Sequence, residues 1–419
     1  MRPGARVQAA IDLVAAIEEA QAAGRAPADS LIQQYFRKRR YAGSKDRRAV
    51  IDLVYEVQRT RGMLTWRLGG SEASTPRLLV LLACAQPVDA SLFDGAHTPE
   101  PLSEEEIALL GRASSVDEAD APDWARFNVP EWLIPHIRGR FGDGLETEMA
   151  ALEMRAPLDI RVNVLRGSIE QAQEALPDAV PGGWAPCCLR LTEARSLTQD
   201  QAYKDGLIEI QDEGSQIAAL LCDAKPGMQV LDLCAGGGGK TLALAAQMGN
   251  SGQIFAYDNE PKRLAALKPR ANRSDARSIQ YPKTLNDLSQ KMDRVVLDMP
   301  CSGSGTWRRS PDLRWRLTEE RLGVLLDTQS KLLDQGAGFV KPGGQLIYIV
   351  CSILKQEAED QITAFLNRHA EFRVRPYRSN WFDPDAAPHS LAESDEMLLM
   401  TPASHGTDGF FVAVLQHGQ

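Results

Sequence analysis

The sequence predicts an α/β protein in which a helical N-terminal region precedes a domain built on a doubly wound sheet. Apolar residues in the first hundred positions recur every three or four residues, as they do in amphipathic helices. The last third instead alternates short apolar strands with helical stretches, which is typical of βαβ units and a mostly parallel sheet. With 419 residues, 43% hydrophobic and 25% charged, the chain is long enough for two or three packed domains.

Three segments predict the N-terminal helices. The first has the apolar spacing of Val7, Ile11, Val14 and Ile17. The second, with Ala49, Leu53, Val57 and Leu64 on one face, follows Ser44 as a possible N-cap. The third, RLLVLLACA at 77–85, is either a buried helix or a buried strand, because periodicity does not separate the two. The acidic, proline-containing stretch that ends near Asp123 predicts a linker or a long surface loop, and a domain boundary.

The predicted strands form two groups. The first group lies after Pro157, at 159–165, 187–192 and 206–212. The second group lies at 228–234, 253–258, 294–299 and 345–352, and a last strand at 410–416 closes the chain. The predicted domains are therefore a helical domain with its acidic linker at 1–125, a small connecting α+β region at 126–200 and the doubly wound domain at 201–419.

The net charge of −9 is concentrated in one segment. Residues 89–125 contain ten acidic side chains against Arg112 alone, so the rest of the chain is neutral overall. Within that rest, the basic segment RKRRYAGSKDRR at 37–48 begins with Arg37, Lys38, Arg39 and Arg40. Basic side chains beside aromatic ones can hold RNA phosphates, although a solvated helix end has the same composition.

Other sequence features limit the classes of protein to which this chain can belong. The first twenty residues are interrupted by Gln8, Asp12 and Glu18, and no apolar run reaches spanning length, so we expect no signal peptide, no membrane span and a cytoplasmic location. Seven scattered cysteines predict free thiols rather than a disulfide framework. Because no Cys-x-x-Cys or His-x-x-x-His pair occurs, we expect no metal site. We also expect a monomer.

A glycine loop within VLDLCAGGGGKT, at 230–241, predicts a nucleotide-like ligand. Glycines let a ligand approach the backbone, and the following helix presents free N–H groups. A P-loop needs glycine at the position of Cys234, which disfavours a nucleotide triphosphatase. Asp258, 22 residues after Gly236, instead stands where a doubly wound fold places the acid that accepts from ribose hydroxyls. The residues expected to bind this S-adenosylmethionine-like or dinucleotide ligand are Cys234, Ala235, Gly236, Gly237, Gly238, Gly239, Lys240 and Asp258.

Two cysteines follow predicted strands of the same sheet. Asp298 and Cys301 come after one strand, and Cys351 ends another. Ligands bind at the carboxyl ends of such strands, so both thiols can face one crevice, although buried structural cysteines are the common alternative. The stretch after Cys301 places four arginines among two tryptophans, which predicts the wall of a nucleic-acid groove: Arg308, Arg309, Arg314 and Arg316 with Trp307 and Trp315.

The segments DLCAGGGGKT, LDMPCSGSGTWRRSPDLRW and YIVCSI, in this order and spacing, resemble motifs I, IV and VI of the Nop/Sun family of RNA cytosine-5 methyltransferases. RVNVL, QDEGSQ, KPGG and TDGFF extend the resemblance from about residue 128 to the end. The helical front resembles the NusB-like domain of the bacterial small-subunit rRNA enzymes in that family. The resemblance implies a Rossmann-like class I methyltransferase domain with a doubly wound mixed sheet, preceded by an all-helical NusB-like domain.

The same resemblance implies a reaction and roles for named residues. Cys351 attacks carbon 6 of a cytosine, Asp298 contacts the base edge and the cofactor, and Cys301 helps to release the product. S-adenosylmethionine is the implied methyl donor. RNA is the implied partner, with rRNA favoured over tRNA. A non-catalytic RNA-binding assembly factor remains a third possibility. This chain departs from the motif at Gly236-Gly237 and Val350, and the acid implied shortly before Asp298 as an adenine contact is absent from SIQYPK at 278–283.

Overall fold

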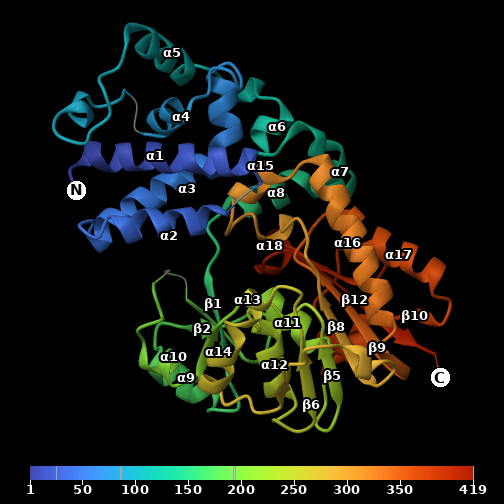
Figure 1. Cartoon of the computed structure of the whole chain (residues 1–419). Coiled ribbons are helices and arrows are strands. Elements are labelled where there is room, and N and C mark those ends of the chain that lie inside the picture. Colours follow the sequence, from blue (N-terminus) through green and yellow to red (C-terminus); the bar gives the residue numbers. More distant parts are fainter. Residues whose placement is uncertain (25, 85–86, 192, 194, 419) are drawn as a thin grey trace. The chain divides into compact units, whose positions relative to one another are not determined.

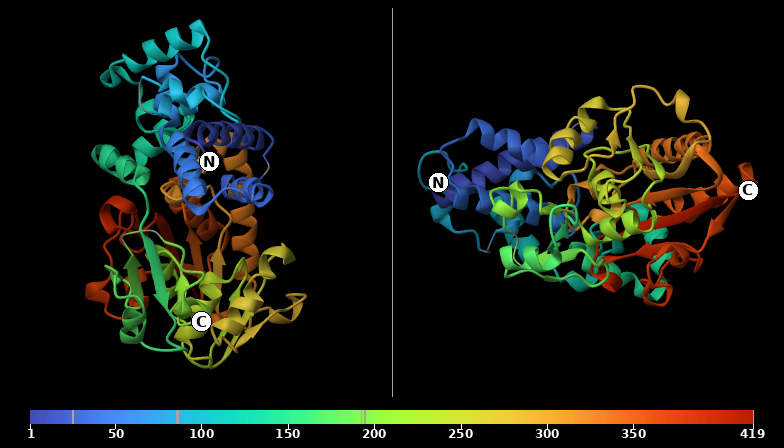
Figure 2. Two further views of the ribbon diagram at one scale, coloured as in Figure 1. Left: turned by 90° about the vertical axis from the view of Figure 1, so that its left-hand side faces the viewer. Right: turned by 90° about the horizontal axis from the view of Figure 1, so that it is seen from below.

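A computed structural model describes residues 1–24, 26–84, 87–191, 193 and 195–418 (Figure 1). The chain forms two compact units. The first comprises Met1–Glu153 and Arg309–Glu319, and the second comprises Met154–Arg308 and Glu320–Gln419. The N-terminus lies in the first unit and the C-terminus in the second (Figure 2). The chain passes from the first unit to the second at Glu153, whereas the sequence predicted a boundary at 125.

The described residues of the first unit form helices and no strand, as predicted. The α-helices are α1 (Pro3–Ala22), α2 (Ala28–Lys38), α3 (Ser44–Arg67), α4 (Pro76–Ala83), α5 (Glu104–Ser114), α6 (Asp123–Arg126), α7 (Ile134–Phe141), α8 (Leu145–Glu153) and α15 (Asp312–Arg316). Helix α1 packs against α3 and α4, and its predicted stripe of Val7, Ile11, Val14 and Ile17 is buried. The helical N-terminal prediction is therefore confirmed.

Two details of these helices correct the sequence predictions. Ser44 is the first residue of α3 and not its N-cap, because Gly43 occupies the cap position and no side chain bonds there. Of the predicted face of α3, Val57 and Leu64 are buried, whereas Ala49 and Leu53 are half-buried and the neighbouring Val50 and Val54 are buried instead. The ambiguous segment is helix α4, whose N-cap Thr75 accepts a hydrogen bond from the Leu78 backbone N–H. Ala85, at the end of that segment, lies outside the described residues.

The acidic stretch is not simply a loop. Its central part forms helix α5, which starts with a capping box in which the Ser103 hydroxyl accepts from the Glu106 N–H and the Glu106 carboxylate accepts from the Ser103 N–H. Leu110 and Ala113 of this helix are buried against the helical core. Three glutamates in the first turn also favour the helix start electrostatically, so the predicted linker or long surface loop contains a helix.

A small antiparallel sheet opens the second unit. Its strand order is β2-β3-β1-β4, from β1 (Leu158–Val162), β2 (Val180–Pro181), β3 (Cys188–Leu191) and β4 (Ile208–Ile210). Helices α9 (Ile169–Ala175) and α10 (Gln201–Lys204) accompany it. Ile160, Leu189 and Ile208 belong to its buried core. The first group of predicted strands is thus confirmed, apart from Thr192, which lies outside the described residues.

The larger sheet of the second unit has the order β10-β12-β9-β8-β5-β6-β7, with β11 paired to β12. The strands are β5 (Gln229–Asp232), β6 (Gln253–Ala256), β7 (Ile279–Gln280), β8 (Met292–Asp298), β9 (Val340–Val350), β10 (Phe372–Arg375), β11 (Leu398–Met400) and β12 (Phe410–His417). Strands β5 to β9 are parallel, and β12 runs antiparallel to β9, β10 and β11. The predicted doubly wound mixed sheet is confirmed.

Successive residues of the central strands enter two different cores. Val230, Val296 and Ile347 pack on one face, with residues of the helices on that side. Leu231, Val295 and Leu346 pack on the other. The connecting helices are α11 (Glu213–Leu220), α12 (Gly239–Gln247), α13 (Pro261–Leu264), α14 (Leu267–Arg273), α16 (Glu319–Ala337), α17 (Glu359–Arg368) and α18 (Pro402–His405). A sheet buried on both faces requires apolar side chains in both directions, which explains the continuous apolar strands.

The strand order fixes where a ligand binds. From β5 the chain winds outward to β6 and β7, and it then crosses back to β8 and β9 on the other side of β5. The carboxyl ends of β5 and β8 therefore flank the topological switch point, where open α/β sheets bind their ligands. Among the residues that the structure describes, no helix combines the length and apolar character that crossing a membrane requires.

Candidate active site

The glycine loop lies at the switch point, between β5 and α12. Gly236 and Gly238 have positive φ angles of 50° and 82°. A Cβ atom at Gly238 would lie 2.1 Å from Cδ1 of Leu267, so this position accepts glycine alone. Cys234 and Ala235 join the strand to the loop, and helix α12 begins at Gly239. The predicted sequence of strand, glycine turn and helix is confirmed.

Asp258 lies two residues beyond β6 and holds the glycine loop. Its carboxylate is 5% exposed and accepts hydrogen bonds from the N–H groups of Gly236, at 2.9 Å, and Glu260, at 2.8 Å. A carboxylate has about four acceptor positions, so acceptor capacity remains for ribose hydroxyls. At the end of the neighbouring strand β7, Gln280 is exposed and followed by Tyr281, so the structure supplies no acid there.

Asp298, the last residue of β8, is paired with Lys240. The Lys240 Nζ lies 2.8 Å from Asp298 Oδ2 and 5.2 Å from the centre of the Phe410 ring. Burial lowers the pKa of Lys240, but the charge and hydrogen bond of Asp298 outweigh it and leave that pKa raised. The ammonium group is therefore a fixed positive charge beside Asp298. The sequence analysis treated Lys240 as part of the glycine loop and did not foresee this pairing.

Asp232 is a buried acid that the sequence analysis missed. It ends β5, is 1% exposed and accepts a hydrogen bond from the Thr241 hydroxyl at 2.6 Å. Burial raises its pKa to about 7, and the Thr241 hydrogen bond opposes that shift. An acid at the end of a buried strand next to the glycine loop was the available signal, because ligands bind at this edge of the sheet.

The two predicted cysteines lie side by side. The Sγ atoms of Cys301 and Cys351 are 3.4 Å apart, and both residues are partly exposed. Cys351 directly follows β9, and Cys301 lies three residues beyond the end of β8, so the pairing of these two strands places the thiols in one crevice. The hydrogen bond to Cys351 and burial together raise the pKa of the Cys301 thiol well above its usual value. All seven cysteines are free, as predicted.

A buried carboxylate, Glu357, joins the loops that carry the cysteines. It is fully buried, and its Oε1 accepts from the Ser302 N–H at 2.8 Å and from Gln329 Nε2 at 3.0 Å. Its Oε2 accepts from the hydroxyls of Ser302, at 2.5 Å, and Ser352, at 2.6 Å. Ser302 and Ser352 each follow a cysteine directly, so one side chain sets the spacing of both thiols. We call Glu357, Ser302, Ser352 and Gln329 the Glu357 network.

Backbone contacts add to this connection. The Gly305 N–H donates to the Cys351 carbonyl at 3.0 Å, and the Ile353 N–H donates to the Ser304 hydroxyl at 3.0 Å. Tyr348 in β9 donates its hydroxyl to the Glu357 carbonyl at 2.6 Å. A buried carboxylate with several donors is costly to disturb, because each orphaned donor loses its partner without regaining water. This network was not predicted from the sequence, where its only signal is a serine directly after each of the two cysteines.

The basic segment of the first unit is largely exposed. Arg37, Lys38 and Arg40 are exposed at the end of α2, where cations also favour the helix dipole. The Arg39 guanidinium lies 3.6 Å above the centre of the Tyr35 ring. These positions are open to phosphates, as the prediction requires.

The prediction that the arginines and tryptophans after Cys301 line a nucleic-acid groove is wrong for most of these residues. Arg308 is buried, donates to Asp408 Oδ1 at 2.5 Å and lies 3.5 Å from Asp212, so its charge is compensated within the protein. Trp307 and Arg314 have no exposed surface. Arg314 donates to the Leu152 carbonyl within the first unit, and Trp315 lies beneath Arg61 there. Arg309 is partly exposed.

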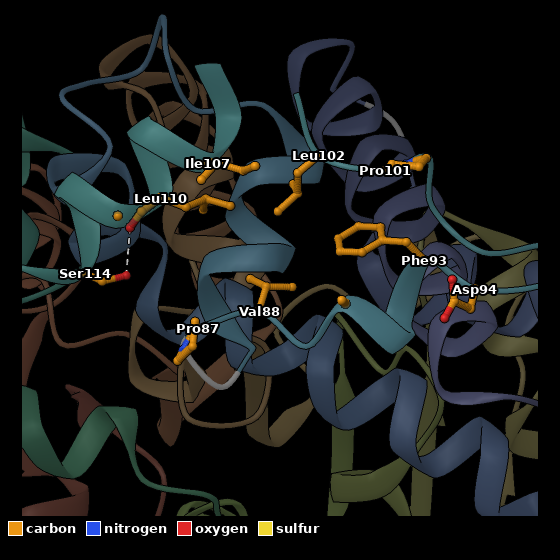
Figure 3. Close-up of a pocket in the computed structure, with 11 residues that line it drawn as sticks. Pro87, Val88, Phe93, Asp94, Pro101, Leu102, Ile107, Leu110 and Ser114 are labelled. Carbon is orange, nitrogen blue, oxygen red and sulfur yellow. Dashed lines mark hydrogen bonds between the residues drawn. The ribbon is translucent and has the colours of Figure 1, made fainter. Parts of the chain in front are cut away.

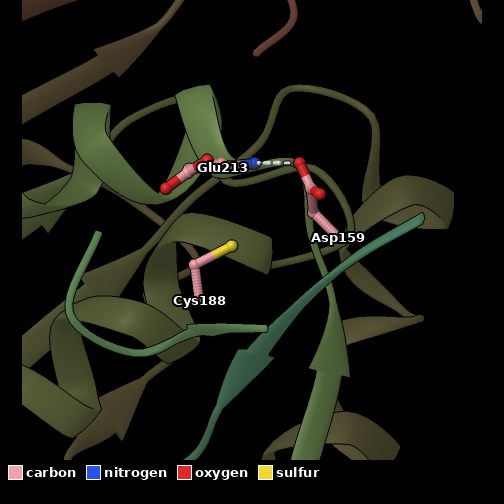
Figure 4. Close-up of side chains that lie close together, drawn as sticks. All are labelled: Asp159, Cys188 and Glu213. Carbon is pink, nitrogen blue, oxygen red and sulfur yellow. Dashed lines mark hydrogen bonds between the residues drawn. The ribbon is translucent and has the colours of Figure 1, made fainter. Parts of the chain in front are cut away.

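Asp159, Cys188 and Glu213 form a compact group in the region of the small sheet, with potential ligand atoms within 4.8 Å of one another (Figure 4). Arg190 already supplies a cation, since its guanidinium donates to Asp159 at 2.6 Å and to Glu213 at 3.0 Å. Glu213 also accepts from the Trp184 N–H at 2.6 Å. Burial raises the pKa of the Cys188 thiol, which keeps it neutral. We interpret this group as a buried ion pair.

A doubly wound sheet with a glycine loop, an acid after the second strand and polar groups at the switch point is typical of Rossmann-like domains that bind nucleotide-like ligands, and the class I methyltransferases are one class of these. The family model described as 16S rRNA methyltransferase RsmB/F matches residues 219–416, and a model of the RsmF/B-like ferredoxin-like domain matches 129–198. The "Probable ribosomal RNA small subunit methyltransferase B" of Synechocystis is 32% identical, over 88% of this chain and 91% of that protein. This chain belongs to the RsmB/F family of methyltransferases.

Other relatives and solved structures agree. The ribosomal RNA small subunit methyltransferase B of Shewanella oneidensis is 27% identical over 89% of this chain and 91% of that protein. The crystal structure of PH0851 has a TM-score of 0.80 and 26% identity, covering 99% of both chains. A methyltransferase homolog protein from Pyrococcus horikoshii has a TM-score of 0.60 and 27% identity, covering 70% of this chain and 97% of its own.

Proposed function

We propose that this protein transfers a methyl group from S-adenosylmethionine to carbon 5 of a cytosine in small-subunit rRNA, through a covalent adduct at Cys351. The observation that carries the proposal is the pair of thiols, 3.4 Å apart at the ends of adjacent strands, beside the Asp298–Lys240 pair. The membership of the RsmB/F family and the names of the curated relatives support rRNA as the substrate. No observation in the site favours tRNA.

Carbon 5 of cytosine is a weak nucleophile until carbon 6 carries a temporary bond. The Cys351 sulfur attacks carbon 6, and the electron pair of the ring double bond then makes carbon 5 nucleophilic. After methylation, the proton on carbon 5 passes to water, the ring double bond re-forms, and the Cys351 sulfur leaves as a thiolate. Asp298 contacts the base edge during these steps and Lys240 holds its carboxylate. The target base must leave its stack, which costs least in looped or single-stranded RNA.

The glycine loop and Asp258 are the groups that fit the methyl donor. Bound S-adenosylmethionine supplies an electrophilic methyl group and leaves as the thioether. The loop lets the donor approach the backbone at the start of α12, and the Asp258 carboxylate accepts from the ribose hydroxyls. The absence of an acid after β7 means that adenine is held by groups other than a carboxylate there.

The two cysteines have different roles. A thiol with a raised pKa stays protonated near neutral pH, so Cys301 is suited to donate a hydrogen bond to the Cys351 sulfur and to assist product release. An assembly factor without catalysis would have no need of two adjoining thiols. A nucleotide triphosphatase is disfavoured further, because Lys240 is paired with Asp298 instead of being free for a phosphate.

Bisulfite mapping of small-subunit rRNA, from cells with and without this protein, tests the function. We expect at least one cytosine to resist conversion only when the protein is present, and purified protein with S-adenosylmethionine to restore that resistance on unmodified rRNA. If the rRNA maps are identical with and without the protein, and the purified protein methylates a tRNA, then the substrate is tRNA and not rRNA.

A further inference from the structure

The helical unit contains a cavity of about 910 Å³, between the segment 87–102 and helix α5 (Figure 3). Side chains of Val88, Phe93, Leu102, Ile107 and Leu110 line it. Its volume lies within the range of about 300–1,000 Å³ that ligand sites occupy. Ile107 is 56% exposed, although it stands on the face of α5 that lines the cavity. Exposing this much apolar surface to water is costly, and large exposed apolar surfaces mark interaction sites.

One acidic side chain lines this cavity and others are next to lining residues in the sequence, and the Arg77 guanidinium donates to the backbone carbonyls of Glu100 and Pro101. Asp94 belongs to its lining, and three exposed acids directly precede lining residues or lie one turn before them on α5: Asp89, Glu100 and Glu104. Nine of the eleven lining residues belong to the segment 89–125, which has ten acidic residues and one arginine. Glu106 of the same helix is paired with Arg77 at 2.7 Å, so this acid stabilises the unit itself.

The apolar lining and the nearby acidic side chains together favour one class of partner over another. Acidic groups repel the phosphates of RNA, and the lining offers an RNA backbone nothing to bind. A polypeptide segment that inserts apolar side chains and carries lysine or arginine beside them satisfies both the lining and the rim. An amphipathic helix that lays its apolar face into a groove is the usual form of such a segment.

We propose that this cavity docks a basic amphipathic helix of a protein that is itself bound to the rRNA substrate. The proposal rests on the proposed function, since it takes the substrate to be rRNA that already carries protein. Proteins that bind RNA must neutralise phosphates and are therefore rich in lysine and arginine. The acidic cavity thus recognises the protein component of a partly assembled subunit, while the basic segment at 37–48 serves the RNA component.

A substitution at a glycine of the cavity lining tests the docking proposal. Gly111 lines the cavity on α5, and a Cβ atom there would meet no heavy atom within 4 Å. Gly111→Leu adds an apolar side chain at a lining position where a Cβ atom meets open space, and it removes a glycine from a helix, which stabilises the helix by about 0.5–1 kcal/mol. Gly139→Leu in α7 is the matched control, because a Cβ atom at Gly139 also meets open space and lies outside the cavity lining.

Direct binding is measured by calorimetry with an amphipathic Leu/Lys peptide of about five helical turns. A peptide with serine in place of leucine, and the same charge, is the second probe. We expect the Leu/Lys peptide to bind wild type and Gly139→Leu equally, and Gly111→Leu about tenfold more weakly. Equal affinity for all three proteins, or equal binding of the serine peptide, would each overturn the proposal.

A second experiment compares the rates of methylation of two substrates, which are naked small-subunit rRNA and the same rRNA carrying ribosomal proteins. Gly111→Leu should methylate naked rRNA at the wild-type rate and the protein-bearing particle several-fold more slowly, whereas Gly139→Leu should match wild type on both. A variant as active as wild type on the particle contradicts the proposed docking. Failure of the proposed function looks different, because wild type would then methylate neither substrate while the peptide measurements stay as they are.

Discussion

At the scale of single residues, the Asp258 carboxylate combines an observed contact with a proposed one. It holds the Gly236 N–H and is expected to accept from the ribose of the methyl donor. Losing charge-assisted hydrogen bonds costs about 1.5–3 kcal/mol, so Asp258→Ala should weaken S-adenosylmethionine binding about ten- to a hundredfold in calorimetry. Glu260→Ala, an exposed acid on the same loop, is the control and should bind normally. An unchanged affinity for Asp258→Ala would mean that the ribose lies elsewhere.

Glu357 is the residue whose loss should separate chemistry from binding. In Glu357→Gln one carboxylate oxygen becomes an NH₂ group that faces the donors of the Glu357 network, so the two cysteine loops lose their fixed spacing. A misplacement of about 1 Å can cost about a hundredfold in rate, and we expect kcat to fall at least tenfold while the KM for RNA changes little. The measurement is steady-state methylation of rRNA with the variant and with wild type.

Glu359→Gln is the matched control for this prediction. Glu359 is also buried, 4% exposed, and it accepts from the Glu393 N–H at 3.2 Å. We expect this variant to keep kcat. Glu357→Asp, which retains the charge on a shorter stem, should recover part of the wild-type rate. A Glu357→Gln enzyme with normal kcat, or one that differs from wild type only in thermal stability, would reduce Glu357 to a structural role.

At the scale of elements, the end of α2 is the part of the first unit best suited to RNA. Replacing Arg37, Lys38, Arg39 and Arg40 with glutamine removes cations that release counterions when RNA binds. The plot of log affinity against log salt should flatten by about 0.7 for each phosphate of single-stranded RNA that these cations no longer neutralise. Filter binding at several salt concentrations measures the slope.

The control for that prediction removes two cations at the amino-terminal edge of the large sheet. Lys225 and Lys341 lie near the amino ends of β5 and β9, away from the carboxyl ends where ligands bind, and each is paired with an aspartate. Substituting glutamine for both should leave the slope as it is. A basic segment whose replacement also leaves the slope unchanged, in a folded protein, would be a solvated surface only.

Elements with a strong local pattern could be predicted, and interactions between distant segments could not. The strand, glycine turn and helix around Gly238 follow from neighbouring residues, as does the stripe of α1. Arg308 shows the limit, because the acids that compensate it, Asp212 and Asp408, lie far away in the sequence. A tryptophan and arginine pattern is the same whether those side chains face RNA or the interior. The Glu357 network was missed for the same reason.

At the scale of the whole molecule, the order of strands brings the chemistry together. Asp232, Asp298, Cys301 and Cys351 come from segments up to about 120 residues apart, yet all lie at or near the carboxyl ends of β5, β8 and β9, which are adjacent in the sheet. The sequence allowed the positions of Asp298, Cys301 and Cys351 to be predicted, but not the contribution of Asp232, because alternation of strands and helices determines which strand ends share an edge. It did not reveal the 3.4 Å approach of the two sulfurs, which depends on the loops beyond the strands.

The most direct test of this account is a denaturing gel of the two cysteine variants incubated with rRNA and S-adenosylmethionine. Cys301→Ala should form the bond to carbon 6 and methylate, but release its product slowly, so a retarded protein–RNA band should accumulate only when S-adenosylmethionine is present. Cys351→Ala should bind RNA without methylating it and give no such band. A band that requires Cys301 and survives the loss of Cys351 would reverse the two roles, and the absence of a band from both variants would contradict covalent catalysis.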